Sequence, residues 1–414
     1  MRRLEVAPLT RVEGHGRVEL EVIEDRLAAA RVLINESPRL FEGMVLGRDA
    51  AEIPSLVCRI CAICSTVHRL AACQALEQAL GVIIPPRAAL IRELALLGGH
   101  IESHALHLYC LVYPDLVDAD SVLQPLQQGD PLAKDGLALK AFGNRLQTVA
   151  GGRRIHPINL EIGGVLHAPA DDELAALQDE LEGWLKRIEP LIEPFFREDA
   201  WPDAGPVAGL RIAVDGNGEF TLTGDNLVCS DSSMVNASGY RDLLQETALP
   251  DTNAKQSRKG GTSLLTGALA RCEFASPGDK TTPFPPGIHA NNAAQGLELV
   301  WSLERAHDIC RQLRAETGDL CSPFRAGPGS GTCVIEAPRG ILVHHYELDD
   351  MGRVGAADII TPTAINSTAM EEQLLADLAD ETDEPTMRQT AARIIRAYDP
   401  CISCSVHVLR VDRP

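Results

Sequence analysis

The chain has 414 residues, of which 58 are acidic and 38 are basic, so its formal net charge is -20. This acidic balance disfavours non-specific binding to nucleic acid or to an anionic membrane surface. Hydrophobic residues make up 45% and charged residues 23%, close to the globular average, which excludes disorder as the main state. No apolar stretch approaches the ~18 residues that span a bilayer, and the start of the chain lacks the apolar core of a secretion signal. We therefore expect a cytoplasmic protein with no nucleic-acid partner and no direct membrane insertion.

The spacing of apolar residues predicts strands at the start of the chain and helices over much of the rest. Residues 1–36 alternate apolar and polar side chains, which predicts a small antiparallel sheet. Over residues 51–118 the spacing becomes helical, and the break at Pro85 and Pro86 predicts two long helices. The remaining predicted elements are amphipathic helices at 171–197, 292–317 and 387–398, a strand-like stretch with a glycine-rich turn at 209–223, and a hairpin at 333–360.

No fixed repeat and no low-complexity linker divides the chain. We expect one domain over residues 1–414, of the α+β class and predominantly helical, with a large helical bundle as its core and small peripheral β-sheets. Its expected parts are an N-terminal β region at 1–50, a mainly helical body with β insertions at 51–398, a C-terminal motif at 399–407 and a tail at 408–414.

Twelve cysteines are too few for a disulfide scaffold and more than packing needs. Eight stand singly, where a small buried hydrophobe is the ordinary role. The other four form two CxxC pairs, Cys61 with Cys64 and Cys401 with Cys404. If the first pair is helical, Cys61, Cys64 and His68 face the same way.

Four thiolates at this spacing suit structural zinc, an iron–sulfur cluster, or nickel and iron. Most of the protein separates the two pairs, so we expect the metal site to be buried between the N-terminal and C-terminal motifs. His100, His104 and His107 share one face of a predicted helix and suggest a further metal, although packing or proton relay is the commoner role of such histidines.

Further motifs surround these cysteines in a specific order. They are Thr10–Gly16 (TRVEGHG), Arg39–Glu42 (RLFE), Arg59–Cys64 (RICAIC), Glu336–Gly340 (EAPRG) with His344, Thr361–Ala364 (TPTA) and Asp399–His407 (DPCISCSVH). In this order and spacing, the chain resembles the large, catalytic subunit of nickel–iron hydrogenases over nearly its whole length. The chain is most similar to the cytoplasmic NAD(P)-linked branch, which includes the alpha subunits of sulfhydrogenases. The shared features are a short length, the lack of a membrane anchor and a brief tail.

The resemblance implies a set of metal ligands. Cys61 and Cys401 match terminal nickel ligands, while Cys64 and Cys404 match the thiolates that bridge nickel to an iron carrying carbon monoxide and cyanide. Glu42 and His407 match the ligands of a second, hard cation near the C-terminus, magnesium or iron. A solvated Glu42 and a structural zinc at the four cysteines remain the alternatives.

The resemblance also implies roles in catalysis. Glu13 matches a proton gate that exchanges protons with a cysteine thiol, with Cys401 as the expected acceptor. Arg339 matches an arginine over the metal site, where it can face cyanide or Asp399, and Thr361 and Thr363 match possible hydrogen-bond donors to cyanide. An ordinary exposed carboxylate and a surface arginine are the alternatives for Glu13 and Arg339.

Two positions depart from the family pattern. Ala62 stands between the first two cysteines, where the family usually has glycine, and its methyl group is expected to narrow access or to shift the backbone. Many periplasmic relatives have an aspartate where this chain reads Glu102-Ser103-His104. Arg339 is therefore expected to lack one carboxylate partner.

The implied reaction is the reversible heterolysis of dihydrogen. No cysteines remain for an iron–sulfur wire, so the expected partners are a small subunit with iron–sulfur clusters and flavin-containing diaphorase subunits that pass electrons to NADP or NAD. A maturation endopeptidase is expected to remove residues 408–414 after His407. The alternatives are a structural four-cysteine zinc protein and a hydrogen-sensing regulatory subunit.

Overall fold

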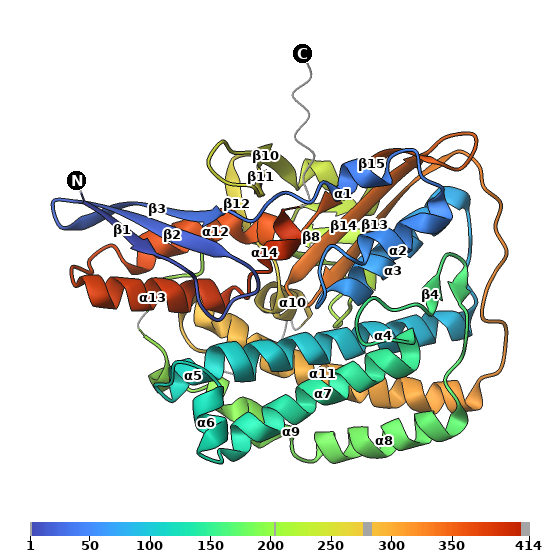
Figure 1. The fold of residues 1–414 in the computed structure, drawn as a ribbon, viewed down its shortest axis with the longest axis horizontal. Coiled ribbons are helices and arrows are strands. Elements are labelled where there is room, and N and C mark those ends of the chain that lie inside the picture. Colours follow the sequence, from blue (N-terminus) through green and yellow to red (C-terminus); the bar gives the residue numbers. More distant parts are fainter. Residues whose placement is uncertain (1, 203, 276–283, 407–414) are drawn as a thin grey trace.

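The computed structural model describes residues 2–202, 204–275 and 284–406. Within these ranges helices form the larger part of the fold (Figure 1). The longer helices are α3 (Ser65–Leu80), α4 (Pro86–Ala105), α7 (Pro131–Gly151), α8 (Asp171–Leu185), α11 (Ala290–Ala315), α12 (Pro362–Asp377) and α13 (Glu384–Ala397). The shorter ones are α1 (Phe41–Val45), α2 (Ile53–Val57), α5 (Tyr113–Leu116), α6 (Leu123–Gln127), α9 (Ile188–Ile192), α10 (Ala268–Ala275) and α14 (Ile402–Ser405), and the π-helical turn η2 (Leu106–Val112) continues α4.

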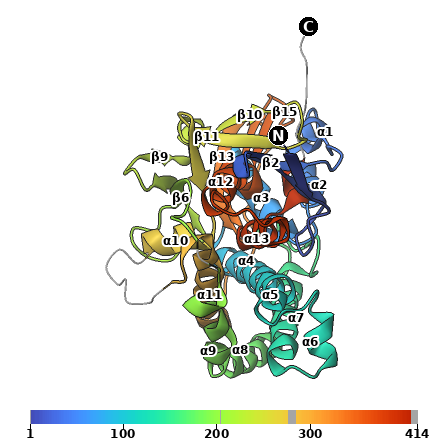
Figure 2. The same cartoon turned by 90° about the vertical axis from the view of Figure 1, so that its left-hand side faces the viewer.

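The long helices pack together on one side of the molecule. Helix α4 lies along α7 and α11, and α8 lies against α11 (Figures 1 and 2). Glycines allow the close approach of α4 and α7, because a Cβ atom on Gly143 would lie 2.5 Å from the backbone nitrogen of Glu102. The contact therefore brings two backbones together and fixes the position of the histidine-bearing end of α4.

Three small sheets cover the other side. Strands β1 (Arg2–Val6), β2 (Gly16–Ile23) and β3 (Arg26–Ile34) form an antiparallel sheet, and the inward side chains of β2 pack against α12 and α13. A four-stranded sheet has the order β15-β14-β13-β7, and α3 packs against β13 and β14. A mixed sheet has the order β10-β11-β12-β6-β8-β9.

The strands of the second and third sheets have these bounds: β6 (Leu210–Val214), β7 (Thr223–Gly224), β8 (Asn226–Cys229), β9 (Met234–Asn236), β10 (Gln245–Ala248), β11 (Lys255–Lys259), β12 (Thr262–Leu265), β13 (Gly329–Ala337), β14 (Gly340–Leu348) and β15 (Val354–Ile360). A two-stranded ribbon, β4 (Leu160–Glu161) with β5 (Gly164–Val165), completes the described sheets. The tight turn between β13 and β14 carries Arg339 toward the interior.

The predicted fold class is confirmed: a helical core, small sheets and a cysteine cluster between the two CxxC motifs. The opening antiparallel sheet, the two long helices of 51–118 and the predicted hairpin are also present. The hairpin gains a third strand, β15, and only the two ends of 209–223 are strands, which pair with different neighbours. Among the described residues, no helix combines the length and apolar character needed to cross a membrane.

The conditional helix through the first CxxC pair is wrong. Helix α3 begins at Ser65, so Cys61 lies in a turn and Cys64 immediately precedes the helix. His68 is one turn into α3, and its Nδ1 atom lies 3.1 Å from Nε2 of His344 on β14. The turn releases Cys61 from helical spacing, which lets its sulfur reach the C-terminal pair.

Candidate metal centre

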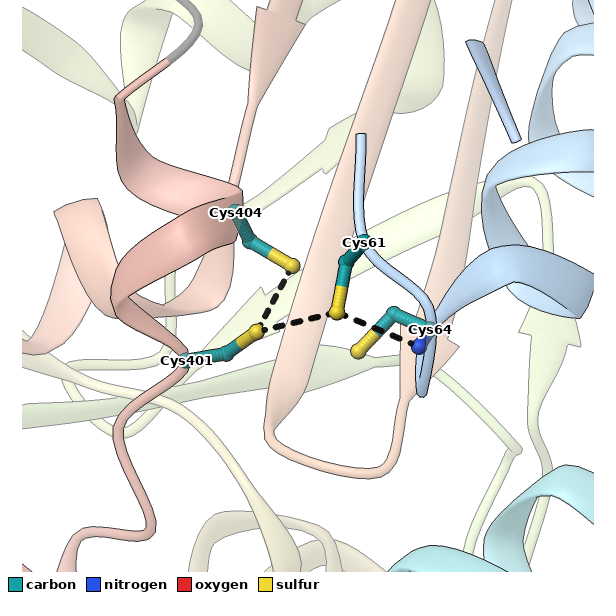
Figure 3. A group of neighbouring side chains, drawn as sticks. All are labelled: Cys61, Cys64, Cys401 and Cys404. Atoms are coloured by element: carbon teal, nitrogen blue, oxygen red, sulfur yellow. Dashed lines mark hydrogen bonds between the residues drawn. The ribbon is translucent and has the colours of Figure 1, made fainter. Parts of the chain in front are cut away.

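Four cysteine sulfur atoms converge where the two ends of the chain meet (Figure 3). The Sγ atoms lie within 4.8 Å of one another, and each cysteine is buried. Cys61 Sγ is 3.4 Å from Cys401 Sγ, and Cys401 Sγ is 2.9 Å from Cys404 Sγ. The separation is that of a site able to hold a metal ion, and soft thiolates suit nickel and iron as well as zinc.

The N-terminal segment holds the C-terminal motif by backbone contacts. Residues Glu13 and Cys401 form an isolated parallel bridge, and the Ile402 amide donates to the Glu13 carbonyl over 3.1 Å. Gly14 follows with φ of 86°, and a Cβ atom there would lie 2.7 Å from Cβ of Ile402. Glycine is therefore required beside Glu13 for both conformation and space.

Arg39 joins the two CxxC segments, a contact that sequence reasoning missed. Its guanidinium donates to the carbonyl oxygens of Ile60 and Ser403, and its backbone amide donates to the Val406 carbonyl over 2.8 Å. The sequence marks Arg39 only by its place in the RLFE motif, from which a role was predicted for Glu42 alone. One side chain thus ties together segments from opposite ends of the chain.

The Glu13 carboxylate lies directly against the cluster. Its Oε2 atom accepts a hydrogen bond from Cys401 Sγ over 3.3 Å and another from the Ser403 amide over 3.0 Å. The residue is half-buried rather than fully exposed. A carboxyl group in this position can exchange a proton with the Cys401 thiol without a bulk-water intermediate.

Arg339 lies on the other side of the cluster. Its Nε atom donates to Asp399 Oδ1 over 3.0 Å, and its Nη1 atom donates to Cys64 Sγ over 3.4 Å. Both charged residues are nearly inaccessible to solvent. Burial alone would lower the pKa of Arg339, but Asp399 and the Cys64 thiolate raise it well above its usual value, so the guanidinium stays charged.

Several buried donors around the two CxxC segments have no partner within the described part of the chain. Among them are Nη2 of Arg339, Nε of Arg39 and the hydroxyl of Thr361. Thr363, two residues further, accepts a hydrogen bond from the Cys401 amide over 2.8 Å, which leaves its own proton available. Small ligands that accept hydrogen bonds, such as cyanide on a bound iron, fit these donors.

Glu42, in the first turn of α1, is buried. Its Oε1 atom accepts a hydrogen bond from the Ile359 amide over 3.0 Å and lies 3.7 Å from Lys255 Nζ. The predicted companion of Glu42, His407, lies outside the described residues, as do 408–414. Because Glu42 is buried, the alternative of a solvated Glu42 is wrong.

The four thiols differ in acidity because they face different neighbours. Hydrogen bonds from the Cys401 and Cys404 thiols lower the pKa of Cys64 well below its usual value, and Arg339 adds to this effect. Burial raises the pKa of Cys401 and of Cys404 well above the usual value. All four groups can be thiolates in this buried site only when a bound cation neutralises them, as a metal centre would.

His104 on α4 belongs to a buried ion-pair network, whereas His107 lies on the π-helical turn outside this network. His104 Nε2 lies 2.6 Å from Glu298 Oε2, and Arg271 binds both Glu298 and Glu336. Burial alone would raise the pKa of Glu298, yet Arg271 and His104 lower it to about 2. Although His100 also lies within metal-binding reach, the Arg271 charge opposes a cation there.

The two departures from the family pattern lie at the edge of the centre. Ala62 is exposed, and it borders a cavity of about 320 Å³ with Ile63 and Leu106, so its methyl group meets open space. Ser103 is fully buried and its hydroxyl has no partner among the described residues. Arg339 therefore has one carboxylate partner, Asp399, in this part of the structure.

Comparison with known proteins identifies the family. The family described as nickel-dependent hydrogenase matches residues 39–135 and 290–407, and a family described as HoxL-like matches residues 3–36. The chain is 34% identical to the alpha subunit of sulfhydrogenase 2 from Pyrococcus furiosus, covering 99% of this chain and 100% of that one. It is 29% identical to the alpha subunit of the coenzyme F420 hydrogenase from Methanocaldococcus jannaschii, covering 99% and 95%.

A solved structure gives the same assignment. The NAD+-reducing [NiFe]-hydrogenase in its H2-reduced state matches with a TM-score of 0.83 and 27% identity, covering 98% of this chain and 100% of that one. The matching family is nickel-dependent and four buried thiols converge at the site, which favours nickel and iron over structural zinc. The chain belongs to the nickel-dependent hydrogenases and is the large, catalytic subunit of a nickel–iron enzyme.

Proposed function

We propose that this subunit catalyses the reversible heterolytic cleavage of dihydrogen into two protons and two electrons. The observation that carries the proposal is the contact between the Cys401 thiol and the Glu13 carboxylate, 3.3 Å apart, beside the four-cysteine cluster. A thiolate that takes up a proton needs an adjacent base to pass it on, and Glu13 has the right chemistry and distance.

Cys61 and Cys401 are the proposed terminal ligands of nickel, and Cys64 and Cys404 the proposed bridges to an iron carrying carbon monoxide and cyanide. When bound, this group supplies an open coordination position at which dihydrogen is polarised. The mutual distances of the four sulfur atoms support the ligand set. With the group bound, Arg339, Thr361 and Thr363 would donate hydrogen bonds to the diatomic ligands, and the unpartnered donors of Arg339 and Thr361 in the described structure support this role.

The protein's own contribution to the reaction is proton transfer and charge balance. Cys401 takes the proton, and Glu13 accepts it through the existing hydrogen bond and carries it away from the cluster. The Ser403 amide holds the carboxylate in place during this exchange. On the other side, Asp399 keeps Arg339 aimed at the Cys64 sulfur, where its positive charge favours the thiolate.

Glu42 and His407 are the proposed ligands of a magnesium or iron ion near the C-terminus. The burial of Glu42 supports this, because a carboxylate out of water needs a cation or several donors. Removal of residues 408–414 by a maturation endopeptidase would leave His407 as the chain end. Intact-mass measurement of metal-loaded protein should give a chain that ends at His407, and a loaded, active chain that ends at Pro414 would contradict this step.

The proposed electron route passes through a small iron–sulfur partner and then through flavin-containing partners in the cytoplasm to NADP, NAD or another soluble acceptor. Support comes from the names of the relatives, one of them part of a sulfhydrogenase and another an NAD+-reducing hydrogenase. Copurification of partner chains, with spectroscopy of their clusters and flavin, tests this route.

One infrared spectrum tests the centre directly. Purified enzyme should show the stretching bands of carbon monoxide and cyanide, together with stoichiometric nickel. A hydrogen-sensing protein would share these bands, so the turnover rate with an artificial acceptor separates the two functions. Stoichiometric nickel without diatomic bands would contradict the proposed iron ligands.

A further inference from the structure

A buried chain of hydrogen bonds runs from Arg339 beside the metal centre, through α11, to the π-helical turn η2. Asp399 stands between two donors: Arg339 Nε reaches Oδ1 over 3.0 Å, and Gln295 Nε2 reaches Oδ2 over 3.2 Å. On its other side, Gln295 Oε1 lies 2.6 Å from His107 Nδ1. His107 Nε2 lies 2.7 Å from the Arg396 carbonyl oxygen. Gln295 and His107 are almost completely buried, so solvent does not substitute for these contacts.

The contacts of the His107 imidazole hold the Gln295 side chain. The amide oxygen of Gln295 faces one ring nitrogen, and the Arg396 carbonyl oxygen faces the other. The ring is thereby fixed between α11 and α13, and it fixes Gln295 in turn.

The orientation of the Gln295 amide follows from its two neighbours. Turning the amide by half a rotation would set its oxygen against an oxygen of Asp399. In the observed orientation, the amide nitrogen donates to Asp399 and the amide oxygen faces Nδ1 of His107. Gln295 therefore connects the His107 ring to the Asp399 carboxyl group.

The π-helical turn, which begins at Leu106, brings His107 to this position.

We propose that His107 and Gln295 are positioning residues: His107 holds Gln295, and Gln295 fixes the Asp399 carboxyl group and thereby aims Arg339 at the Cys64 sulfur. The assignment rests on the proposed function only through the role of Arg339. With both Asp399 oxygens engaged, the carboxyl group cannot rotate, and Arg339 keeps Nη1 on Cys64. Neither residue touches the cluster in the described structure, so each acts through Asp399.

The first test concerns His107 itself and uses enzyme assembled with its partners. His107→Phe keeps an aromatic ring but removes both ring nitrogens, so it cannot donate to the Gln295 amide oxygen. The variant should retain nickel and shift the infrared bands of the diatomic ligands. Nickel-loaded His107→Phe enzyme with unshifted bands would overturn the role of His107.

The second test measures whether Gln295 controls the orientation of Arg339. Gln295→Glu places an acceptor against Asp399 with little change in size, and Gln295→Leu removes both hydrogen bonds. Both variants should retain nickel, shift the infrared bands of the diatomic ligands and lose about ten- to a hundredfold in turnover, the range for a lost hydrogen bond to a charged group. The matched control is Gln373→Leu, since Gln373 is also buried and also donates to a carboxylate, that of Asp377, over 3.0 Å.

The outcomes separate this inference from the proposed function. If Arg339→Lys shifts the bands while nickel-loaded Gln295→Glu and Gln295→Leu leave them and the turnover unchanged, the positioning role is wrong and the proposed function stands. If wild-type enzyme itself shows no diatomic bands and no turnover, the proposed function fails independently. An equal band shift in Gln373→Leu would also overturn the positioning role, because it would show a general packing effect.

Discussion

Cys61 Sγ lies 3.4 Å from Cys401 Sγ, although 340 positions separate the two residues in the chain. Two features make this contact possible: the turn that holds Cys61 before α3, and the pairing of Cys401 with Glu13 near the N-terminus. The centre therefore forms only after both ends of the chain have folded against the helical core. Metal loading and correct closure of the C-terminus are consequently coupled.

Replacing a proposed bridging thiolate should abolish metal binding. In Cys64→Ser and Cys404→Ser, a weakly acidic hydroxyl cannot substitute for a soft bridging thiolate, so nickel analysis should show loss of the metal. Cys310→Ser is the control, since Cys310 is equally buried but lies on α11 in the hydrophobic core. Stoichiometric nickel and full activity in either bridging variant would disprove the ligand assignment.

Removing the titrating group at position 13 should stop proton exit while leaving the centre intact. Glu13→Gln preserves size and can still accept from the Ser403 amide, but it cannot carry a proton by titration. We expect normal nickel, iron and diatomic bands, with hydrogen–deuterium exchange and dihydrogen oxidation lower by about 10²–10⁴-fold. Glu5→Gln, an exposed position on β1, should behave as wild type. Unchanged exchange in fully loaded Glu13→Gln enzyme would remove Glu13 from the mechanism.

Breaking the Arg271 network should destabilise the fold. Arg271→Met leaves Glu298 and Glu336 buried without their cation, and the loss of one partner of a buried pair costs about 3–5 kcal/mol. Urea unfolding of the purified protein measures the change. Arg305→Met removes a partly exposed partner of Glu93, where a loss of about 0–1 kcal/mol is expected. Equal stability losses in the two variants would contradict the buried-network interpretation.

His289 should make the stability fall as the solution becomes acidic. Burial lowers the pKa of His289 to about 4, and Arg393 adds to this effect, whereas an unfolded histidine titrates near ~6.5. Between these values the unfolded chain binds more protons, so stability falls as the pH decreases, by about 3 kcal/mol over this window. His289→Phe keeps an aromatic ring against Trp201 and should lack this component of the pH dependence in denaturant titrations. An unchanged pH slope in the variant would contradict the burial effect.

The sequence by itself determined the parts that depend on local order. Alternation in 1–36 and helical spacing in 51–118 predicted the opening sheet, α3 and α4, because side-chain periodicity follows directly from backbone geometry. The two CxxC pairs and the surrounding motifs predicted a thiolate centre and its family, since ligand chemistry depends on residue type and spacing.

The tertiary structure decided which distant groups meet. Periodicity cannot show that Arg39 bridges the carbonyls of Ile60 and Ser403, or that Gln295 donates to Asp399. The first CxxC pair was expected on a helix if local pattern prevailed, yet it lies in a turn. Helical spacing describes only neighbours along one segment, whereas the centre requires sulfur atoms from two segments to converge. That convergence depends on the packing of the whole chain, which no single segment encodes.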